Sequence, residues 1–194
     1  MKLISPQTQA LIEETLAAAR SRNPEDLGRQ TLRLLNNLYS LANFAEAQNI
    51  LLYLPYLGGF EYKAIVRNLF LLHKTLHFVD ANSLNGLKIM YAPAIKDLVY
   101  KTAFNLPRPN PNACKQVRLS DIDIIIVNGI AFDEKGNRMG NGNELYDKLT
   151  ARLSPTVRKI AIAYETQLLP VIPVDARNKP VDIIVTDKRT IYKI

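Results

Sequence analysis

The chain has few cysteines and histidines, the residues that form the disulfides of secreted proteins and bind metals. It has one cysteine, Cys114, in 194 residues, so no internal disulfide can form. Disulfide frameworks belong to oxidising compartments, and a lone cysteine fits the reducing cytosol. The only histidines, His73 and His77, are four residues apart and are expected to share one helix face. Because zinc needs three or four ligands, we interpret both as ordinary surface or core residues.

Long hydrophobic runs are absent as well. The strongest candidate, Ile50–Leu57, contains Pro55. It falls far short of the roughly 20 apolar residues that a membrane-spanning helix requires. The first residues, MKLISPQTQALIEE, reach acidic side chains before any long apolar run, so no signal peptide is expected. The sequence therefore predicts a cytoplasmic protein with no membrane partner.

Basic side chains are in excess, with 25 Lys and Arg against 18 Asp and Glu and a net charge of +7. This balance favours an anionic ligand such as a nucleotide, a polyglutamylated cofactor or a nucleic acid, although plain solubility explains it equally well. Aromatic residues interleaved with basic ones are not concentrated anywhere, so we rank nucleic acid below small molecules. We expect a monomer that binds small molecules.

Hydrophobic patterning predicts helices alternating with strands. Helical spacing of apolar residues predicts helices over 6–22, 24–43 (capped by Asn23), 61–73 and 144–153. Apolar, β-branched runs predict strands at 49–54, 74–80, 88–92, 122–127, 159–164, 181–186 and 191–193. A further run, 98–102, is a candidate partner for the two strands before it.

This alternation is typical of a three-layer α/β fold with a mostly parallel sheet flanked by helices. The length suits a single domain, 1–194, in which an N-terminal helical pair (1–45) packs on the α/β core. The proline-rich segment LPRPNPNAC is expected to be an extended internal connection, because each proline keeps its predecessor out of helical angles.

The most informative segment is Asp121–Lys148, which predicts a buried strand, a glycine-spaced polar loop and then a helix. Gly136, Gly140 and Gly142 allow the backbone to bend tightly and approach a ligand. Arg138 lies between them, and its planar fork suits a phosphate or carboxylate. Backbone N–H groups and a helix N-terminus at the edge of a sheet are common phosphate sites, although such a loop is often only a turn.

Two carboxylates are candidates for a magnesium site. Asp147 falls in the first turn of the helix after the loop, and Asp182 opens a later strand. Magnesium typically takes one or two protein carboxylates, with phosphates and waters as its other ligands. The alternative is structural: Asp147 favours the helix N-terminus, and Asp182 caps a strand.

Two long motifs resemble one family. The segment GIAFDEKGNRMGNGNELYDK is similar to the signature P-G-x-A-F-D-x-x-G-x-R-L-G-x-G-x-G-Y-Y-D-R of 5-formyltetrahydrofolate cyclo-ligases, also called 5,10-methenyltetrahydrofolate synthetases. The later segment IAIAYETQLLPVIPVDARNKPVDIIVTDK is similar to the family's G-x-A-Y-x-x-Q and x-D-x-P-V-D-x-I-V-T-E elements. Upstream, Leu106–Pro109 stands at the family's I-x-E-P element, and Ile50–Tyr53 followed by Glu61 resembles its strand and substrate glutamate.

The resemblance implies a three-layer fold of the sugar-isomerase and CoA-transferase type. It also implies ATP- and Mg²⁺-dependent conversion of 5-formyltetrahydrofolate to 5,10-methenyltetrahydrofolate through a phosphorylated formyl (imidate) intermediate. Positioning and charge neutralisation dominate such chemistry, so no histidine or cysteine nucleophile is needed.

The resemblance also implies roles for individual residues. It assigns catalysis to Arg138 and Tyr146, and magnesium to Asp147 and Asp182. The implied ATP contacts are Arg138, Gly140, Gly142, Lys148, Arg20 and Arg22. The implied substrate contacts are Glu61, Tyr53, Asn141, Asn143, Leu145 and Tyr146.

The chain departs from the family pattern on its nucleotide side. Glu144 replaces the third loop glycine, Asn143 a frequent lysine, Leu145 a tyrosine and Lys148 an arginine. Asn128 replaces the proline that opens the motif. The basic pair of the family's first helix has no clear counterpart here, and Arg20 and Arg22 are the candidates to substitute for it.

Two alternatives stay open. One is a catalytically impaired relative that binds a folate, a nucleotide or RNA without turnover. The other is an enzyme with a different substrate on the same fold, such as a sugar-phosphate isomerase. It has less support, because the matching residues belong to the cyclo-ligase motif.

Overall fold

The structure is a computed structural model that describes residues 6–21, 23–54, 61–80, 87–99, 108–140, 145–173 and 179–193. The helices of this part of the chain are α1 (Pro6–Arg20), α2 (Pro24–Tyr39), α3 (Ala42–Glu46), α4 (Tyr62–Leu71) and α5 (Leu145–Thr150). None of the described helices is long and apolar enough to cross a membrane.

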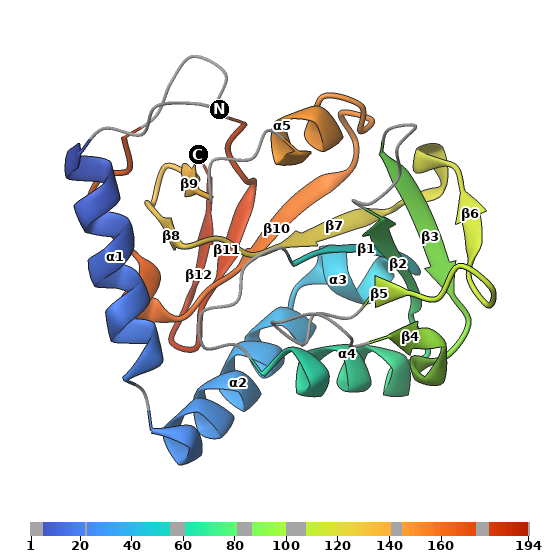
Figure 1. Cartoon of the computed structure of the whole chain (residues 1–194), viewed down its shortest axis with the longest axis horizontal. Helices are drawn as coiled ribbons and strands as arrows, with labels where there is room; N and C mark the ends of the chain where they lie inside the picture. The colour runs from blue at the N-terminus through green and yellow to red at the C-terminus, as the bar shows by residue number, and fades with distance from the viewer. Residues whose placement is uncertain are drawn as a thin grey trace.

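A twisted sheet forms the centre of the molecule (Figure 1). Its strands within the described residues are, in spatial order, β12 (Thr190–Tyr192), β11 (Ile183–Val185), β10 (Arg158–Ile162), β7 (Ile124–Val127), β1 (Asn49–Tyr53), β2 (Thr75–Asp80), β3 (Lys88–Ala92) and β6 (Lys115–Val117). Strands β11, β10, β7, β1 and β2 run parallel, whereas β12, β3 and β6 are antiparallel to their neighbours. The predicted mostly parallel sheet is confirmed.

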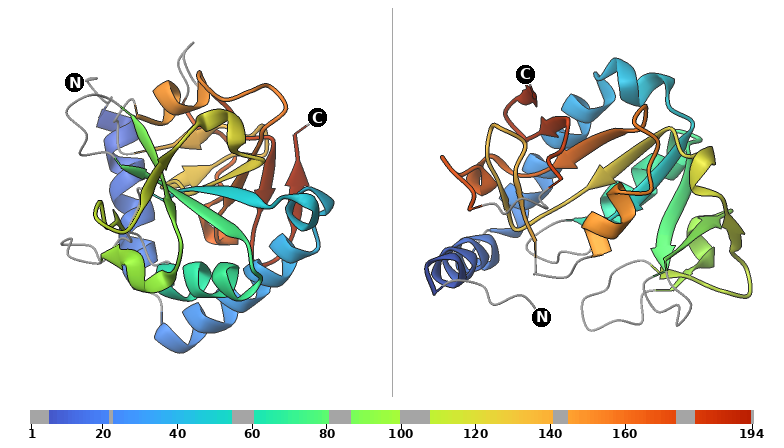
Figure 2. Two further views of the ribbon diagram at one scale, coloured as in Figure 1. Left: turned by 90° about the vertical axis from the view of Figure 1, so that its right-hand side faces the viewer. Right: turned by 90° about the horizontal axis from the view of Figure 1, so that it is seen from above.

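Helices cover both faces of the sheet, as its edge-on view shows (Figure 2). Side chains alternate between faces along a strand. In β1, Ile50 and Leu52 therefore join the core beneath α2, α3 and α4, whereas Leu51 and Tyr53 join the core beneath α5. Helix α1 packs separately, with Ile12 against the segment that follows β7. The three-layer arrangement expected from the sequence is confirmed.

The second predicted helix is two helices. Asn23 caps α2 as expected, because its side chain accepts the Glu25 N–H at 3.0 Å. The helix ends at Tyr39, and α3 starts after Leu41, which has an extended backbone. The apolar spacing continues across this break because Leu38, Leu41 and Phe44 all enter the same core. Periodicity alone therefore predicted one helix where the chain turns.

Two short hairpins lie outside the main sheet. Strand β4 (Leu98–Val99) pairs with β5 (Arg108–Pro109) and not with β2 or β3, so that expected pairing is wrong for the described residues. Strand β8 (Ala131–Phe132) pairs with β9 (Arg138–Met139) inside the predicted polar loop. Strands of two residues carry no alternation that a sequence pattern can reveal.

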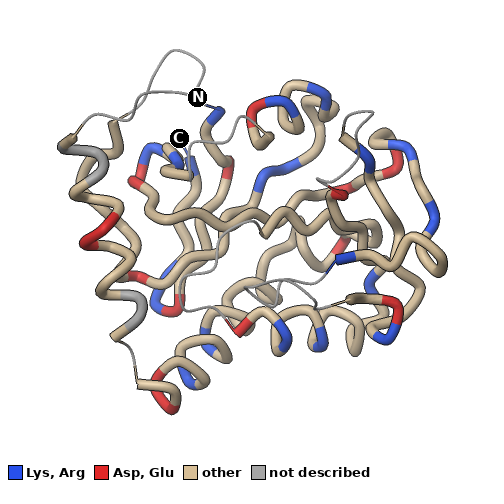
Figure 3. Tube along the Cα trace, viewed as in Figure 1, with Lys and Arg blue, Asp and Glu red and all other residues tan. Residues whose placement is uncertain are grey.

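Charged residues are spread over the molecule. Lysines and arginines occur on helices of both faces and on the β3–β6 side of the sheet, with acidic residues among them (Figure 3). The ranking of small molecules above nucleic acid stays a prediction.

The two histidines do not share a helix face, contrary to the expectation. His73 lies in the turn after α4 with φ 55°, whereas His77 lies in β2. His77 is buried. Its Nε2 is 3.2 Å from Asn49 Oδ1, and its Nδ1 has no partner in the described part of the chain. Burial lowers the pKa of His77, and the weaker effects of Asp121 and Asp123 raise it.

We predict that His77 makes the fold less stable in mild acid. Its folded-state pKa lies below the unfolded value of about 6.5. The contribution of His77 to the free energy of unfolding is therefore fully present above about pH 6.5, and it is lost as pH falls through the folded-state pKa. Denaturant unfolding of the wild type and of His77→Gln measures this. The stability advantage of the wild type should shrink between about pH 7.5 and about pH 5.5. An advantage that is constant over this range contradicts the prediction.

Candidate active site

The hairpin β8–β9 carries the glycine-spaced motif to the start of β11. Gly136 forms its turn with φ +81°, and a Cβ there would lie 2.5 Å from the Val181 carbonyl oxygen. The Val181 N–H also donates to the Gly136 carbonyl at 2.9 Å. Only glycine allows this close approach, which docks the turn of the hairpin that carries Arg138 on Val181, the residue before Asp182.

Asp133 holds the hairpin in shape. Its buried carboxylate accepts the N–H groups of Lys135 and Asn137 at 3.0 Å each, and the Asn137 side-chain amide at 2.8 Å. It also accepts the Ile172 N–H at 3.0 Å, which ties the turn to a distant segment. Its role is therefore structural, since its oxygens are occupied by the chain itself.

The side chain of Arg138 lies against two tyrosine rings. Its guanidinium carbon is 4.6 Å from the ring centre of Tyr146 and 5.7 Å from that of Tyr53. The two ring centres are 5.8 Å apart. Arg138 Nε donates to the Asn128 carbonyl at 2.8 Å. The terminal nitrogens of the guanidinium have no hydrogen-bond partner among the described residues, so their N–H groups are available to an anion.

Two glycines leave room for Arg138. A Cβ on Gly140 would lie 2.6 Å from Arg138 Nη1, and one on Gly129 would lie 3.1 Å from Arg138 Cγ. The first separation is shorter than real side-chain contacts allow. Gly140 therefore serves to admit the guanidinium, in addition to any contact of its backbone with a ligand.

Burial dominates the electrostatics of this cluster. It lowers the pKa of Arg138, and the opposing effects of Tyr53, Tyr146 and Asp147 are weaker. An arginine stays protonated all the same, so the lowered pKa measures how poorly its charge is solvated. A cation in this condition binds an anion more strongly than one in water does.

Tyr146 has a buried hydroxyl without a partner in the described part of the chain. Burial raises the pKa of Tyr146, and Arg138 lowers it. Asp182 and Asp147 raise it further. Both carboxylates thus act on one hydroxyl, although 35 residues separate them in the sequence. The phenol stays protonated at neutral pH and is a hydrogen-bond donor that a ligand can use.

The two predicted metal carboxylates differ in their surroundings. The side-chain carboxylate of Asp147, half-buried in the first turn of α5, has no hydrogen-bond or ion-pair partner among the described residues. Asp182 is engaged. Its Oδ2 accepts the Lys159 N–H at 2.7 Å, and Lys159 Nζ lies 3.0 Å from Oδ1 and 2.8 Å from Oδ2. A metal at Asp182 must therefore compete with the lysine.

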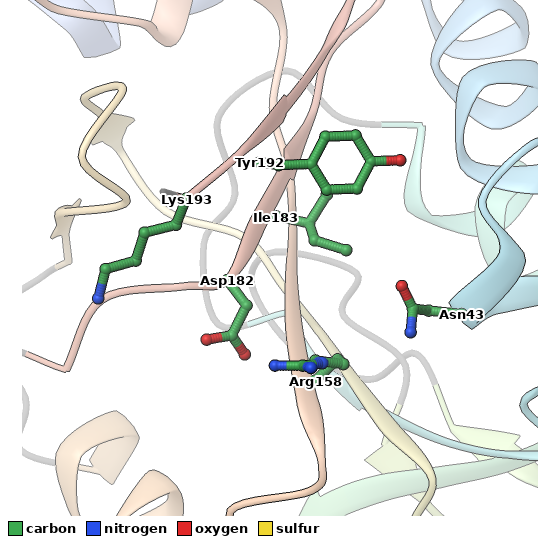
Figure 4. Close-up of a pocket in the computed structure, with 6 residues that line it drawn as sticks. All are labelled: Asn43, Arg158, Asp182, Ile183, Tyr192 and Lys193. Carbon is green, nitrogen blue, oxygen red and sulfur yellow. The ribbon is translucent and has the colours of Figure 1, made fainter.

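A cavity of about 270 Å³ opens beside Asp182. It is lined by Asn43, Arg158, Asp182, Ile183, Tyr192 and Lys193. Tyr192 and Lys193 point to opposite sides of the chain in Figure 4, as successive strand residues do. Arg158 and Lys193 add positive charge on this side of Asp182, which the sequence analysis did not anticipate.

The remaining predicted residues fall into three groups. Glu61 is exposed at the N-cap position of α4, Leu145 is half-buried in α5, and Lys148 is exposed there. Arg20 ends α1, but its side chain is not described. Those that lie outside the described residues are Gly142, Asn141, Asn143 and Arg22.

Three residues of this region were missed as members of the site. Lys159 stood out only as a charge in an apolar strand, and nothing in the pattern named its partner. Gln167 is buried and donates to the carbonyls of Gly129 and Ile130 at 2.9 and 3.1 Å. Asn128 was noted only as a replaced proline, yet it contacts Arg138 directly.

Comparison with known proteins identifies the family. Residues 5–187 match the model of the 5-formyltetrahydrofolate cyclo-ligase family. The match spans nearly the whole chain, so the chain belongs to this family.

Individual relatives agree with this assignment. The chain is 25% identical over 191 residues to 5-formyltetrahydrofolate cyclo-ligase of Mus musculus, covering 92% of this chain and 93% of the mouse protein. It is 27% identical over 143 residues to the Haemophilus influenzae enzyme of the same name, covering 72% and 76%. The solved structure of Aquifex aeolicus 5,10-methenyltetrahydrofolate synthetase superposes with a TM-score of 0.82 at 27% identity, covering 96% of this chain and 92% of that one.

We predict that Gly140→Ala displaces Arg138 from the tyrosine rings. The added methyl group would lie 2.6 Å from Nη1, so the flexible end of the arginine must shift away from its place against the rings. Binding of a nucleotide or phosphate probe should weaken by about tenfold, the value of one charge-assisted hydrogen bond. Isothermal titration calorimetry measures this.

Gly28→Ala is the matched control, because a Cβ at Gly28 in α2 meets nothing within 4 Å. That change should stabilise the fold by about 0.5–1 kcal/mol and leave ligand binding unaltered. Equal affinities in the wild type and Gly140→Ala would show that the glycine serves another purpose.

Proposed function

We propose that the chain converts 5-formyltetrahydrofolate to 5,10-methenyltetrahydrofolate with ATP and Mg²⁺ as the other requirements. Membership of the cyclo-ligase family supports the reaction. The observation that carries the proposal is the half-buried Arg138 guanidinium, whose terminal N–H groups have no partner among the described residues, next to the Tyr146 hydroxyl, which has none there either. A cation and a neutral donor held in this way suit a transferring phosphoryl group.

The reaction needs two bond exchanges. The formyl oxygen of the folate attacks the γ-phosphorus of ATP, the bond from that phosphorus to the β–γ bridging oxygen breaks, and ADP leaves. N10 of the folate then attacks the activated formyl carbon and loses its proton. Phosphate departs with the former formyl oxygen, so one ATP becomes ADP and phosphate for each ring closed.

The family resemblance suggests the roles, and the geometry supports those of Arg138 and Tyr146. Arg138 binds the oxygens of the γ-phosphoryl group, and the tyrosine rings hold its plane in place. The Tyr146 hydroxyl donates to the same group or to the attacking formyl oxygen. Glu61, exposed at the start of α4, pairs with the donor edge of the pterin ring. Tyr53 and Tyr146 exclude water from the reacting atoms.

Asp147 is ready to bind magnesium in this proposal, whereas Asp182 is held by Lys159. Asp147 offers free carboxylate oxygens, which are the ligands that Mg²⁺ prefers. Asp182 can join only when Lys159 releases it. Magnesium in this place supplies charge neutralisation for the phosphate oxygens.

One observation favours the binding-only alternative. The ammonium of Lys159 already neutralises Asp182, so the wild-type chain holds one protein carboxylate ready for a metal instead of two. A relative that binds folate without turnover would have this property. Metal binding and turnover therefore need separate measurements.

The proposal is tested by the absorbance rise of the methenyl product in the near ultraviolet. Purified wild type with 5-formyltetrahydrofolate, ATP and Mg²⁺ should give this rise, and Asp147→Asn should lower the rate by about a hundredfold or more. Asp26→Asn is the control, since Asp26 is an exposed carboxylate in the first turn of α2, as Asp147 is of α5. A wild-type protein that binds folate without converting it would contradict the proposal.

We predict that Lys159→Met strengthens divalent-cation binding. Loss of the ammonium frees Asp182, and the affinity for Mg²⁺ without nucleotide should rise by about tenfold. Calorimetric titration with Mg²⁺ reads this directly, and Lys115→Met on the exposed edge strand β6 is the control. Weaker or equal binding in Lys159→Met would place the metal away from Asp182. Turnover that appears only in this variant would identify the wild type as the impaired relative.

A further inference from the structure

Asn128 connects three elements at the centre of the site. It follows β7 directly and is fully buried. Its N–H donates to the carbonyl of Tyr53 at the end of β1, at 3.3 Å. Its own carbonyl accepts Arg138 Nε at 2.8 Å, and its side-chain amide donates to the hydroxyl of Tyr62.

These partners belong to different parts of the proposed site. Tyr62 is the first residue of α4 and is buried, and the residue before it is Glu61, which is proposed to hold the pterin. Arg138 is proposed to hold the γ-phosphoryl group. A single asparagine therefore joins the folate side to the phosphate side through two consecutive hydrogen bonds.

The residue type matters for this connection. A proline at this position, as in the family signature, has neither a backbone N–H nor a side-chain amide. It would keep the carbonyl that accepts Arg138 Nε but lose the bonds to Tyr53 and Tyr62. The connection from Arg138 to α4 is thus a property of this chain.

The surroundings leave Asn128 little freedom. Gln167 donates to the carbonyls of Gly129 and Ile130, which fixes the backbone immediately after it. A Cβ on Gly129 would lie 3.0 Å from the Met139 carbonyl oxygen, so β9 presses closely on this segment. A displacement of Asn128 is therefore passed on to Arg138 and α4.

We infer that Asn128 is a positioning residue that sets the distance between the bound folate and the transferring phosphoryl group. It touches neither substrate and acts through Tyr62 on one side and Arg138 on the other. The inference rests on the proposed function. Misplacing reacting groups by about 1 Å lowers turnover strongly while each substrate still binds.

The test uses the full-length protein in steady-state assays with 5-formyltetrahydrofolate, ATP and Mg²⁺. Asn128→Ala removes the amide, and Tyr62→Phe removes the hydroxyl that accepts from it. Each change should lower kcat by about tenfold. The Kd for 5-formyltetrahydrofolate without ATP should stay within about twofold of the wild-type value, because each half of the site remains intact. Both changes remove the bond between Asn128 and Tyr62, so the effects of the two single changes on kcat should not add in the double variant.

A matched control separates positioning from general stability. Asn37 donates its side-chain amide to the Thr186 carbonyl at 2.9 Å, a bond of the same kind between α2 and the end of β11. Asn37→Ala should reduce the free energy of unfolding and leave kcat unchanged. Stoichiometric folate binding counts the active molecules of every variant, so loss of folded protein is not mistaken for a slower step.

The outcomes divide clearly. A tenfold lower kcat with an unchanged Kd and no additivity supports the inference. Wild-type kcat per active molecule in Asn128→Ala overturns it and leaves the proposed function standing, as does an additive double variant. A wild type without turnover overturns both.

Discussion

The site depends on one half-buried positive charge. The guanidinium of Arg138 is partly desolvated, and no carboxylate is bonded to it among the described residues. Two tyrosine rings and one carbonyl are its partners. A cation over an aromatic ring gains roughly 0.5–2 kcal/mol, the larger value when it is desolvated. The N–H groups of the guanidinium can gain further stabilisation from an anion.

Much of the nearby architecture follows from that constraint. The Arg138 guanidinium can lie against the two tyrosine rings because Gly129 and Gly140 have no side chains. The hairpin that presents it is held by Asp133 and docked on β11 through Gly136. Motif residues such as Asp133 and Gln167 thus hold the backbone around Arg138.

The acidic residues near Arg138 show a complementary asymmetry. Asp147 is left open on a short helix, whereas Asp182 is neutralised by a lysine of the neighbouring strand. Both influence the Tyr146 hydroxyl, so they share one electrostatic environment. In the proposed magnesium site, release of Asp182 by Lys159 would add a second carboxylate ligand beside Asp147.

The sequence predicted the elements that repeat a pattern and missed those that depend on a distant partner. Apolar strands such as β7 and β1 were predicted because burial on both faces leaves a continuous apolar run. The break between α2 and α3 was missed because both helices present leucines to one core. The hairpin β8–β9 was missed because its strands have two residues each.

The candidate site divides in the same way. Arg138, Tyr146 and Asp147 belong to one contiguous motif, and its resemblance to the cyclo-ligase signature assigned all three to the site, an assignment that stays a prediction. The Lys159–Asp182 pair is an interaction between adjacent parallel strands, and its register depends on the folded sheet. The bond from Asn128 to Tyr62 joins residues 66 apart, and no local pattern encodes it.

The two borders of the sheet have a consequence for association with other chains. Both outermost strands, β6 and β12, have three residues and run against their neighbours. Lys115 stands in one of them, and Lys193 directly follows the other. Short, lysine-bearing borders are poor templates for an incoming strand. The apolar parallel strands at the centre of the sheet are therefore protected from pairing with a strand of another chain.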